Sequence, residues 1–153
     1  MHRHEARIAW TRGDATFVDN RYSRGHEWSF DGGVTVPASS SPSIVPVPWS
    51  VAAAVDPEEA LVASASSCHM LWFLSLAAKE GFVVDRYEDE AYGTVERTAE
   101  GREAFSRITL RPRIAFREGA APSAVQLAAL HHAAHERCYI ANTLKCPVVL
   151  VAA

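Results

Sequence analysis

The chain has few cysteines, no cluster of basic residues and no apolar stretch at its N-terminus. Its 153 residues contain three cysteines, an odd number too small for the disulfide framework of a small secreted protein. Fifteen basic and eighteen acidic residues give a net charge of −3, so nucleic acid and anionic membranes have no electrostatic support as partners. A secretory signal would need an apolar N-terminal region. These features predict a cytoplasmic protein with a small-molecule partner.

Length and composition favour one compact domain. Hydrophobic residues make up 48% of the chain and charged residues 22%, which excludes wholesale disorder and permits a core. At the usual domain size, residues 1–153 form a single domain, or one strongly intertwined with a partner copy.

The order of expected elements predicts an α+β fold with an antiparallel sheet. Apolar alternation and the Asp31-Gly32-Gly33 turn indicate a meander over 5–36, including a strand at Phe17-Val18. Four prolines and four serines over 37–48 indicate a long ordered loop. Later elements are a helix over 57–80, strands within 82–98 and 104–117, a helix over 123–137, an irregular connection over 139–145 and a strand over 147–151.

The helix over 57–80 has the clearest boundaries in the sequence. Asp56 can cap it, Pro57 suits its first turn, and Gly81 ends it. Residues 60–78 carry no formal charge apart from a histidine, close to the length of a membrane span. Several serines make this stretch less apolar than a typical membrane span, and neither end of it is flanked by an excess of basic residues. Burial in a protein core is therefore favoured over membrane insertion.

Residues 104–117 show the cleanest alternation in the chain. Pro112 indicates an edge position. The buried face is predicted to hold Ile108, Leu110, Ile114 and Phe116, and the wet face Thr109, Arg111, Arg113 and Arg117.

Two cysteines are candidates for chemistry. Cys68 lies on the central helix, and Cys138 falls on the core-facing stripe of the second helix. An unpaired cysteine is often simply a small buried hydrophobe. A reactive thiol needs positive charge nearby, and only His69 lies within a turn of Cys68, so that charge would come from elsewhere in the fold. Periodicity leaves open whether the two thiols meet, and Cys146 is assigned to packing.

A metal site is a second interpretation of the second helix. His131, His135 and Cys138 follow one another at i, i+4 and i+7, a spacing that brings ligands to one side of a helix. However, His135 turns roughly 80° from the core stripe at about 100° per residue. A half-exposed histidine face explains the same pattern.

The motifs around both cysteines resemble a known family. Residues 56–61, 65–70 and 79–82 resemble the long central helix of the OsmC/Ohr family, the osmotically inducible and organic hydroperoxide resistance proteins. The run 134–138, Ala-His-Glu-Arg-Cys, resembles that family's second cysteine motif. Element order and length fit across nearly the whole chain.

The resemblance implies an OsmC-like domain with a long buried central helix, working as an intertwined homodimer. It further implies a thiol peroxidase for organic hydroperoxides, with Cys68 as the peroxidatic thiol and Cys138 as the resolving thiol. A lipoyl-type dithiol would restore both thiols, and no metal, flavin or haem would be needed. A non-catalytic small-molecule-binding protein on the same fold is the alternative.

An arginine and a glutamate complete the implied site. Arg24 is matched to the family's arginine, with Arg21 in reserve, and Glu58 to the glutamate that holds it. A straight helix would separate Glu58 from Cys68 by roughly 15 Å. Either the helix breaks near 64–67, or Glu58 serves a partner's cysteine, or the salt bridge is not part of this site.

The second cysteine departs from the family pattern. The family's resolving cysteine is commonly followed by proline, whereas Tyr139 follows Cys138 and a Cys-Pro-Val sequence occurs at Cys146. Only seven residues follow Cys146, too few for the connection and closing strand of the family. Cys138 is therefore the preferred resolving thiol, with Cys146 as the alternative.

Overall fold

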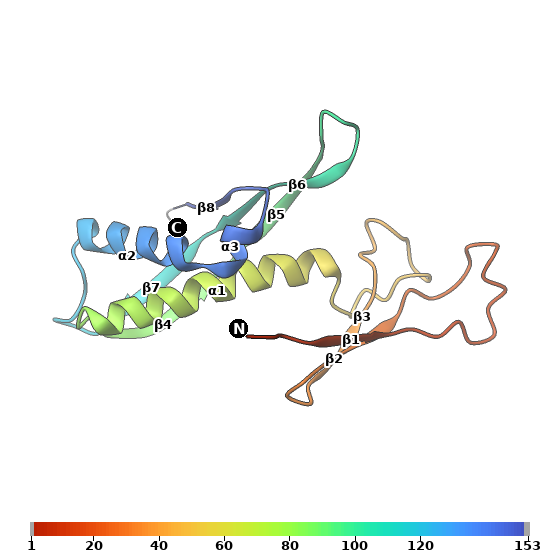
Figure 1. Ribbon diagram of the computed structural model, residues 1–153, viewed down its shortest axis with the longest axis horizontal. Coiled ribbons are helices and arrows are strands. Elements are labelled where there is room, and N and C mark those ends of the chain that lie inside the picture. The colour runs from red at the N-terminus through yellow and green to blue at the C-terminus, as the bar shows by residue number, and fades with distance from the viewer. Residues whose placement is uncertain (1, 152–153) are drawn as a thin grey trace. The chain divides into compact units, whose positions relative to one another are not determined.

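The computed structural model describes residues 2–151, which form two compact units. Residues up to Ala60 make the first unit and residues from Leu61 onward make the second. Figure 1 shows the elements of each unit along the chain. The assignment of the chain to one domain stays a prediction.

The first unit contains the expected antiparallel meander. Strands β1 (Ala6–Ala9), β2 (His26–Phe30) and β3 (Thr35–Ala38) pair in that order. The turn between β2 and β3 places Gly33 at a φ of 85°, which glycine adopts without a Cβ penalty. The strand expected at Phe17 is wrong, because this residue has a φ of 75° within a turn-rich connection between β1 and β2.

Helix α1 (Pro57–Lys79) begins and ends at the expected signals. At its start, the Glu59 N–H donates to Asp56 Oδ1 at 2.7 Å, and the Asp56 N–H donates to Glu59 Oε2 at 3.3 Å, a reciprocal capping box. At its end, Gly81 has a φ of 83° and the Phe82 N–H donates to the Ala77 carbonyl at 2.9 Å. The helix is unbroken across all 23 residues.

Helix α1 is long and apolar enough to cross a membrane by length and composition. Its most apolar window has a mean hydropathy of 1.5, and 28% of that window is buried within the protein. The buried side chains lie on one side and contribute to the cores described below. They are Ala65, His69, Phe73, Leu76 and Ala77.

The second unit contains two small sheets and two further helices (Figure 1). Strand β4 (Val84–Asp89) pairs with β7 (Pro112–Phe116), and β6 (Glu103–Leu110) lies between β5 (Tyr92–Arg97) and β8 (Val148–Leu150). The strand pairs are antiparallel as expected, except that β8 runs parallel to β6. Helix α2 (Ala124–Arg137) begins at a Ser123 capping box, as expected.

The predicted alternation over 104–117 holds in part, because this segment forms two strands of different sheets. Ile108 and Leu110 are buried as expected. Thr109 was predicted to face water but is 2% exposed. It lies between Tyr92 and Val149 in the register of the three-stranded sheet. Directly opposed residues share a face, so side chains of both neighbouring strands flank this threonine.

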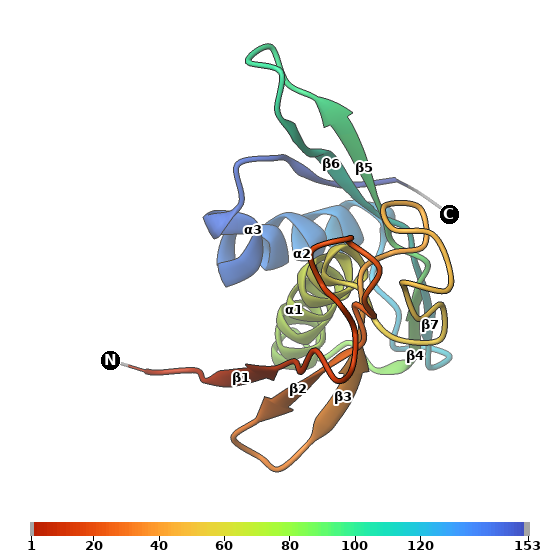
Figure 2. The same cartoon turned by 90° about the vertical axis from the view of Figure 1, so that its right-hand side faces the viewer.

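Two hydrophobic clusters pack against different halves of α1. The first surrounds Phe73 and joins the C-terminal half of α1 to α2 and the β4–β7 sheet. The second surrounds Ala65 and joins the N-terminal half of α1 to the β5–β6–β8 sheet and to α3 (Tyr139–Thr143). Figure 2 shows α2 and the β4–β7 sheet on different sides of α1. Cys68 and His69 therefore lie on α1 between the two clusters.

Gly93 provides a direct test of packing in the second cluster. A Cβ at this position would lie 2.7 Å from Phe105 Cδ1 and 3.0 Å from Val62 Cγ2. We expect Gly93→Ala to lower the free energy of unfolding by about 2 kcal/mol through overpacking. Urea titration followed by circular dichroism would measure it. Gly32→Ala, whose Cβ meets nothing within 4 Å, is the control, and equal small effects of both substitutions would contradict the prediction.

Candidate functional site

The structure brings Cys68 and Cys138 into contact. The Cys68 thiol lies close enough to Cys138 to raise its pKa, although the two residues lie on different helical elements and are far apart in the chain. Cys138 is buried and Cys68 is half-buried, and both are free thiols. The pKa of Cys138 is raised to about 11, first by burial and also by its contact with Cys68, against the lowering effect of the Ala141 N–H. Cys138 therefore keeps its proton at neutral pH.

Cys138 lies at the junction of two helices, where the chain changes direction sharply. Cys138 ends α2 and begins α3, with φ of −70° and ψ of 106°. Its Sγ accepts the Ala141 N–H at 3.4 Å, so the thiol itself caps the short helix. The second helix ends at Arg137 as expected and Cys138 is buried, but the irregular connection expected over 139–145 is wrong, because Tyr139–Thr143 form α3. A sulfur cap and a five-residue helix leave no strong signal in the sequence.

The protonated state of Cys138 has a measurable consequence for its reactivity. With a pKa of about 11 against 9.0 for an ordinary thiol, about 0.1% of Cys138 is thiolate at pH 8 when folded and about 10% when unfolded. We expect iodoacetamide to label Cys138 at least about 100-fold more slowly in the native protein than in urea. Peptide mass spectrometry resolves the rate at this cysteine. Similar rates in both states would contradict the structure.

Cys146 lies elsewhere in the core. It is half-buried and packs in the cluster around Ala65 and Ile108, before strand β8. Among the described residues, the thiol that contacts Cys68 is thus Cys138. The choice of Cys138 over Cys146 as resolving thiol stays a prediction about chemistry, but this geometry agrees with it.

A pair of histidines links the helices that lead to the two thiols. His69 Nε2 and His131 Nδ1 lie 3.1 Å apart, and their rings are nearly parallel at 10°. We refer to His69 and His131 as the histidine pair. Burial, followed by the nearby His131 and His135, lowers the pKa of His69 to about 4, and burial also lowers the pKa of His131. Sequence analysis placed His131 near the core but missed its partner, because periodicity does not relate two helices.

The metal interpretation of His131, His135 and Cys138 is not supported. Within residues 2–151, no three histidine, cysteine, aspartate or glutamate side chains are arranged to hold a metal ion. His131 is engaged with His69, and Cys138 with Cys68 and the Ala141 N–H. The side chains that the helical spacing suggested as ligands therefore have other partners.

Arg24 lies in a pocket of the first unit with a volume of about 500 Å³. Its Nη1 donates to the carbonyls of Asn20 and Tyr22 at 2.9 and 2.6 Å, and its Nη2 donates to Asn20 Oδ1 at 2.6 Å. The guanidinium carbon lies 3.8 Å from the centre of the Tyr22 ring. Nε–H and one Nη2–H have no partner among the described residues, so the cation is fixed and can still donate to a ligand.

The rest of this pocket is amphipathic. One part is an aromatic cluster in which Trp10 and Phe17 contact Tyr22 at ring distances of 5.5 and 4.7 Å. Another part is polar and includes the buried Ser39. Such a lining fits a small organic molecule with one polar end. The pocket is also lined by Ile8, His26, Ser40 and Pro57.

The structure does not join Glu58 to Arg24. The hydrogen-bonding partners of Arg24 are Asn20 and Tyr22, and within residues 2–151 no salt bridge involves Glu58. Arg21, the reserve candidate, is exposed, and its backbone N–H donates to Asp19. Because α1 is unbroken, the break expected near 64–67 is excluded. Either Glu58 serves a second chain or the salt bridge is not part of this site.

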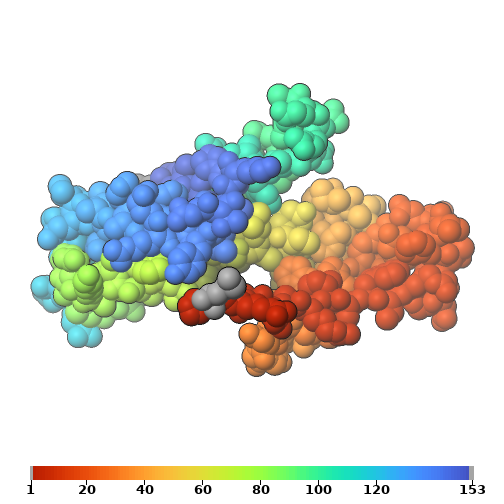
Figure 3. All heavy atoms as spheres, viewed as in Figure 1, coloured from red at the N-terminus to blue at the C-terminus, as the bar shows by residue number. Residues whose placement is uncertain are grey.

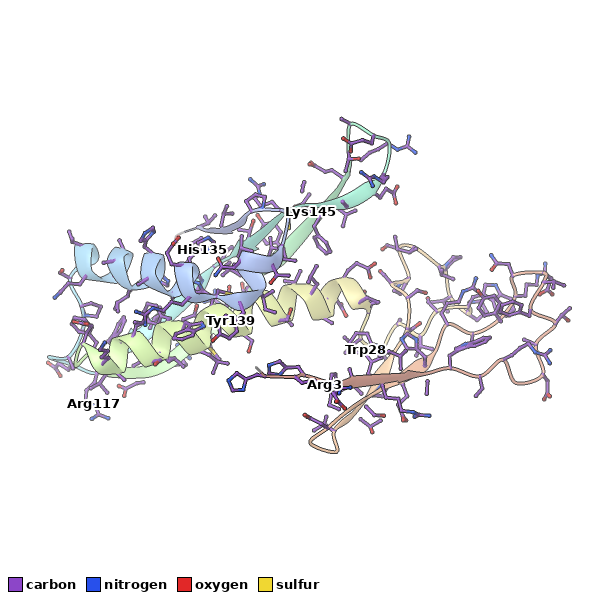
Figure 4. All side chains as sticks on the ribbon, viewed as in Figure 1. Arg3, Trp28, Arg117, His135, Tyr139 and Lys145 are labelled. Atoms are coloured by element: carbon purple, nitrogen blue, oxygen red, sulfur yellow. The ribbon has the colours of Figure 1, made fainter. Side chains whose placement is uncertain are left out.

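Aromatic and basic side chains surround the thiol pair on the second unit. Trp72, one turn after Cys68, makes an edge contact with Tyr139 at 6.1 Å, and the Arg137 guanidinium lies 5.6 Å from the Trp72 ring. Tyr139 is 70% exposed, and Figure 4 labels it on α3. In Figure 3 the surface of α2 and α3 lies directly against α1. A molecule approaching the thiols from this side would meet Trp72 and Tyr139.

The sequence of the part of the chain that carries both thiols matches a known family. The profile of the OsmC-like protein family matches residues 51–152. This chain belongs to the OsmC-like family. The α+β fold with a long central helix, expected from the resemblance, is therefore confirmed.

Solved structures of family members resemble the protein over its whole length. An OsmC-like protein of unknown function from Vibrio cholerae is 47% identical, with a TM-score of 0.97 and full coverage of both chains. An organic hydroperoxide resistance protein OsmC from Legionella pneumophila is 14% identical, with a TM-score of 0.72 over 100% of this chain and 98% of that one.

A third solved structure shares the fold at low identity. The organic hydroperoxide resistance protein OhrB of Bacillus subtilis is 17% identical, with a TM-score of 0.65 over 99% of this chain and 98% of that one. At such identities the likeness shows the fold alone. No curated protein matches the chain.

Proposed function

We propose that the protein is a thiol peroxidase that reduces organic hydroperoxides to alcohols. The observation that carries the proposal is the contact between the Cys68 and Cys138 thiols within the reduced protein. Two thiols in contact can form a disulfide with little rearrangement. The raised pKa of Cys138 supports these roles, because a thiol that keeps its proton is a poor nucleophile. Cys68 is then the attacking thiol and Cys138 the resolving thiol.

The proposed reaction has two steps. The Cys68 thiolate attacks the outer oxygen of the hydroperoxide, an S–O bond forms as the O–O bond breaks, and the departing alkoxide takes up a proton to give the alcohol. Cys138 sulfur then attacks the sulfenic acid sulfur. An S–S bond forms, and the hydroxyl group leaves as water with the Cys138 proton. A dithiol, of lipoyl type in our proposal, regenerates both thiols by exchange.

Arg24 is the proposed cation of this site. A guanidinium fixed by Asn20 and stacked on Tyr22 can donate two N–H groups to a thiolate and a peroxide oxygen without reorganisation. The apolar lining beside it suits the organic body of the substrate. We further propose a homodimer, in which Arg24 and Glu58 complete a site with Cys68, either of the same chain or of the partner.

The proposal is tested by one oxidation event. We expect one equivalent of cumene hydroperoxide, added to the reduced cytoplasmic enzyme, to remove two hydrogens from the intact mass, and peptide mapping to place a disulfide between Cys68 and Cys138. An unchanged mass would reject the peroxidase. A disulfide that includes Cys146 would reject the assigned resolving thiol while leaving the activity.

A binding protein on the same fold is the second candidate function. The pocket around Arg24 favours it, because that pocket offers an apolar wall and a fixed cation independently of any thiol chemistry. Calorimetric titration with a small aromatic carboxylate tests this role. Saturable binding together with unreactive thiols would support the binding protein over the peroxidase.

A further inference from the structure

The histidine pair joins helix α1, which carries Cys68, to helix α2, which ends at Cys138. His69 follows Cys68 on α1, and His131 lies two turns before Cys138 on α2. The ring nitrogens are 3.1 Å apart and the ring centres 5.4 Å apart. Within residues 2–151, this is the one side-chain hydrogen bond between α1 and α2. Apolar side chains of the cluster around Phe73 make further contacts between these helices, and the Arg137 guanidinium lies over the Trp72 ring.

The surroundings of the histidine pair leave it no other partner. His69 is 1% exposed, and its Nδ1 is buried without a hydrogen-bonding group. Phe73 covers the His131 ring at a centroid distance of 4.6 Å and also contacts Tyr87 at 5.7 Å. A displacement of α1 along α2 would therefore leave polar nitrogens unpaired in an apolar environment, which costs more than the hydrogen bond itself contributes.

The unpartnered Nδ1 fixes the proton positions. If Nδ1 of His69 carried the proton, a buried N–H donor would remain unpaired, which is rare in folded proteins. The proton therefore lies on Nε2 of His69, which donates to Nδ1 of His131. The proton of His131 then lies on its own Nε2. His69 is the donor of the pair, and His131 is the acceptor.

We propose that the histidine pair is a positioning device that fixes the register between α1 and α2, so that the Cys68 and Cys138 sulfurs stay within bonding reach. Apolar contacts alone tolerate small sliding motions, whereas a hydrogen bond between two rings holds one register. The pair acts on the spacing of the thiols and does not touch the hydroperoxide. The inference rests on the proposed function only in treating the two thiols as a redox pair.

The test separates the hydrogen bond from the packing of the ring. In His131→Asn, Oδ1 occupies the position of the lost Nδ1 and can still accept from His69, whereas the isosteric His131→Leu cannot. Both variants lose the stacking on Phe73 equally. Each is equilibrated with oxidised and reduced dithiothreitol, which exchanges two hydrogens with the protein thiols. We expect a disulfide equilibrium constant about tenfold lower for the leucine variant than for the asparagine variant.

A second readout does not depend on oxidation. Dibromobimane becomes fluorescent when it bridges two thiols, and we expect slower bridging of Cys68 and Cys138 in reduced His131→Leu than in His131→Asn. If neither variant folds, the isosteric pair His69→Gln and His69→Met replaces them, since glutamine keeps a polar group near Nε2. His132→Leu, at the exposed neighbouring position, is the control and should match wild type.

The outcomes distinguish this inference from the proposed function. Equal disulfide equilibria and bridging rates in the leucine and asparagine variants would overturn the positioning role, even if both variants were less stable. A wild-type protein that forms the disulfide with dithiothreitol but does not consume hydroperoxide would reject the peroxidase alone. The difference between the two variants would then still establish what the histidine pair does.

Discussion

Replacement of Cys68 by serine is expected to lower the rate of hydroperoxide consumption by about a thousandfold or more, because a serine hydroxyl is not ionised at neutral pH and cannot accept the peroxide oxygen. The loss should appear in kcat/KM with both cumene hydroperoxide and a dithiol present. A coupled assay with limiting enzyme measures it. The folded state should be unaffected, since Cys68 is half-buried and serine is of similar size.

Two further variants show whether this loss is specific to the proposed chemistry. Cys138→Ser should reduce one equivalent of hydroperoxide rapidly and then slow down, because the sulfenic acid on Cys68 has no neighbouring thiol and proceeds to sulfinic acid with excess oxidant. Cys146→Ala should retain the wild-type rate, since that thiol packs in the core away from the pair. Equal activity in Cys68→Ser and wild type would reject the mechanism.

The fold was largely predictable because its boundaries depend on local chemistry. The start of α1 follows from the reciprocal hydrogen bonds of Asp56 and Glu59, and the start of α2 from those of Ser123. The turn at Gly33 depends on one backbone conformation. Such signals involve neighbours in the chain, so one sequence is enough to find them.

The failures have a common physical cause in contacts between distant residues. Thr109 was placed on the wet face, yet its burial is set by Tyr92 and Val149 on the neighbouring strands. The parallel pairing of β8 with β6 depends on where the last connection crosses the sheet. Neither the burial of Thr109 nor the pairing of β8 can be inferred from the alternation of apolar and polar residues within one segment.

In the candidate site, too, the features that depend on neighbouring residues were predictable and the contacts between distant residues were not. The two cysteines were found from their motifs, but only the structure shows that their thiols touch. The histidine pair was divided between two arguments, with His69 as a nearby charge and His131 as a metal ligand. Burial lowers the pKa of His69 and so removes its charge, and His131 uses Nδ1 for the hydrogen bond with His69. A titratable residue on a core face is therefore informative only once its partner is known.

Acidification is expected to destabilise the protein through His69. The pKa of His69 is lowered to about 4 in the folded state, first by burial and then by the nearby His131 and His135, against 6.5 for a free histidine. Above pH 6.5 both states are neutral at this residue, and its contribution is constant. Between pH 6.5 and 4 the unfolded chain takes up the proton more readily, so stability falls as the pH falls. The total effect is roughly 3 kcal/mol.

His69→Gln isolates this contribution, because glutamine does not titrate and keeps a polar group opposite His131. We expect the free energy of unfolding of the variant, measured by urea titration at several pH values, to depend less steeply on pH between 6.5 and 4. His132→Gln, at an exposed position on the same helix as His131, should keep the wild-type slope. If His69→Gln and wild type had parallel profiles, the pKa of His69 would not be lowered in the folded protein, and His69 would take up its second proton over the same pH range in both states. The donor and acceptor assignment of the histidine pair would then fail with it, since a doubly protonated ring carries an N–H on Nδ1 as well, where no acceptor is present.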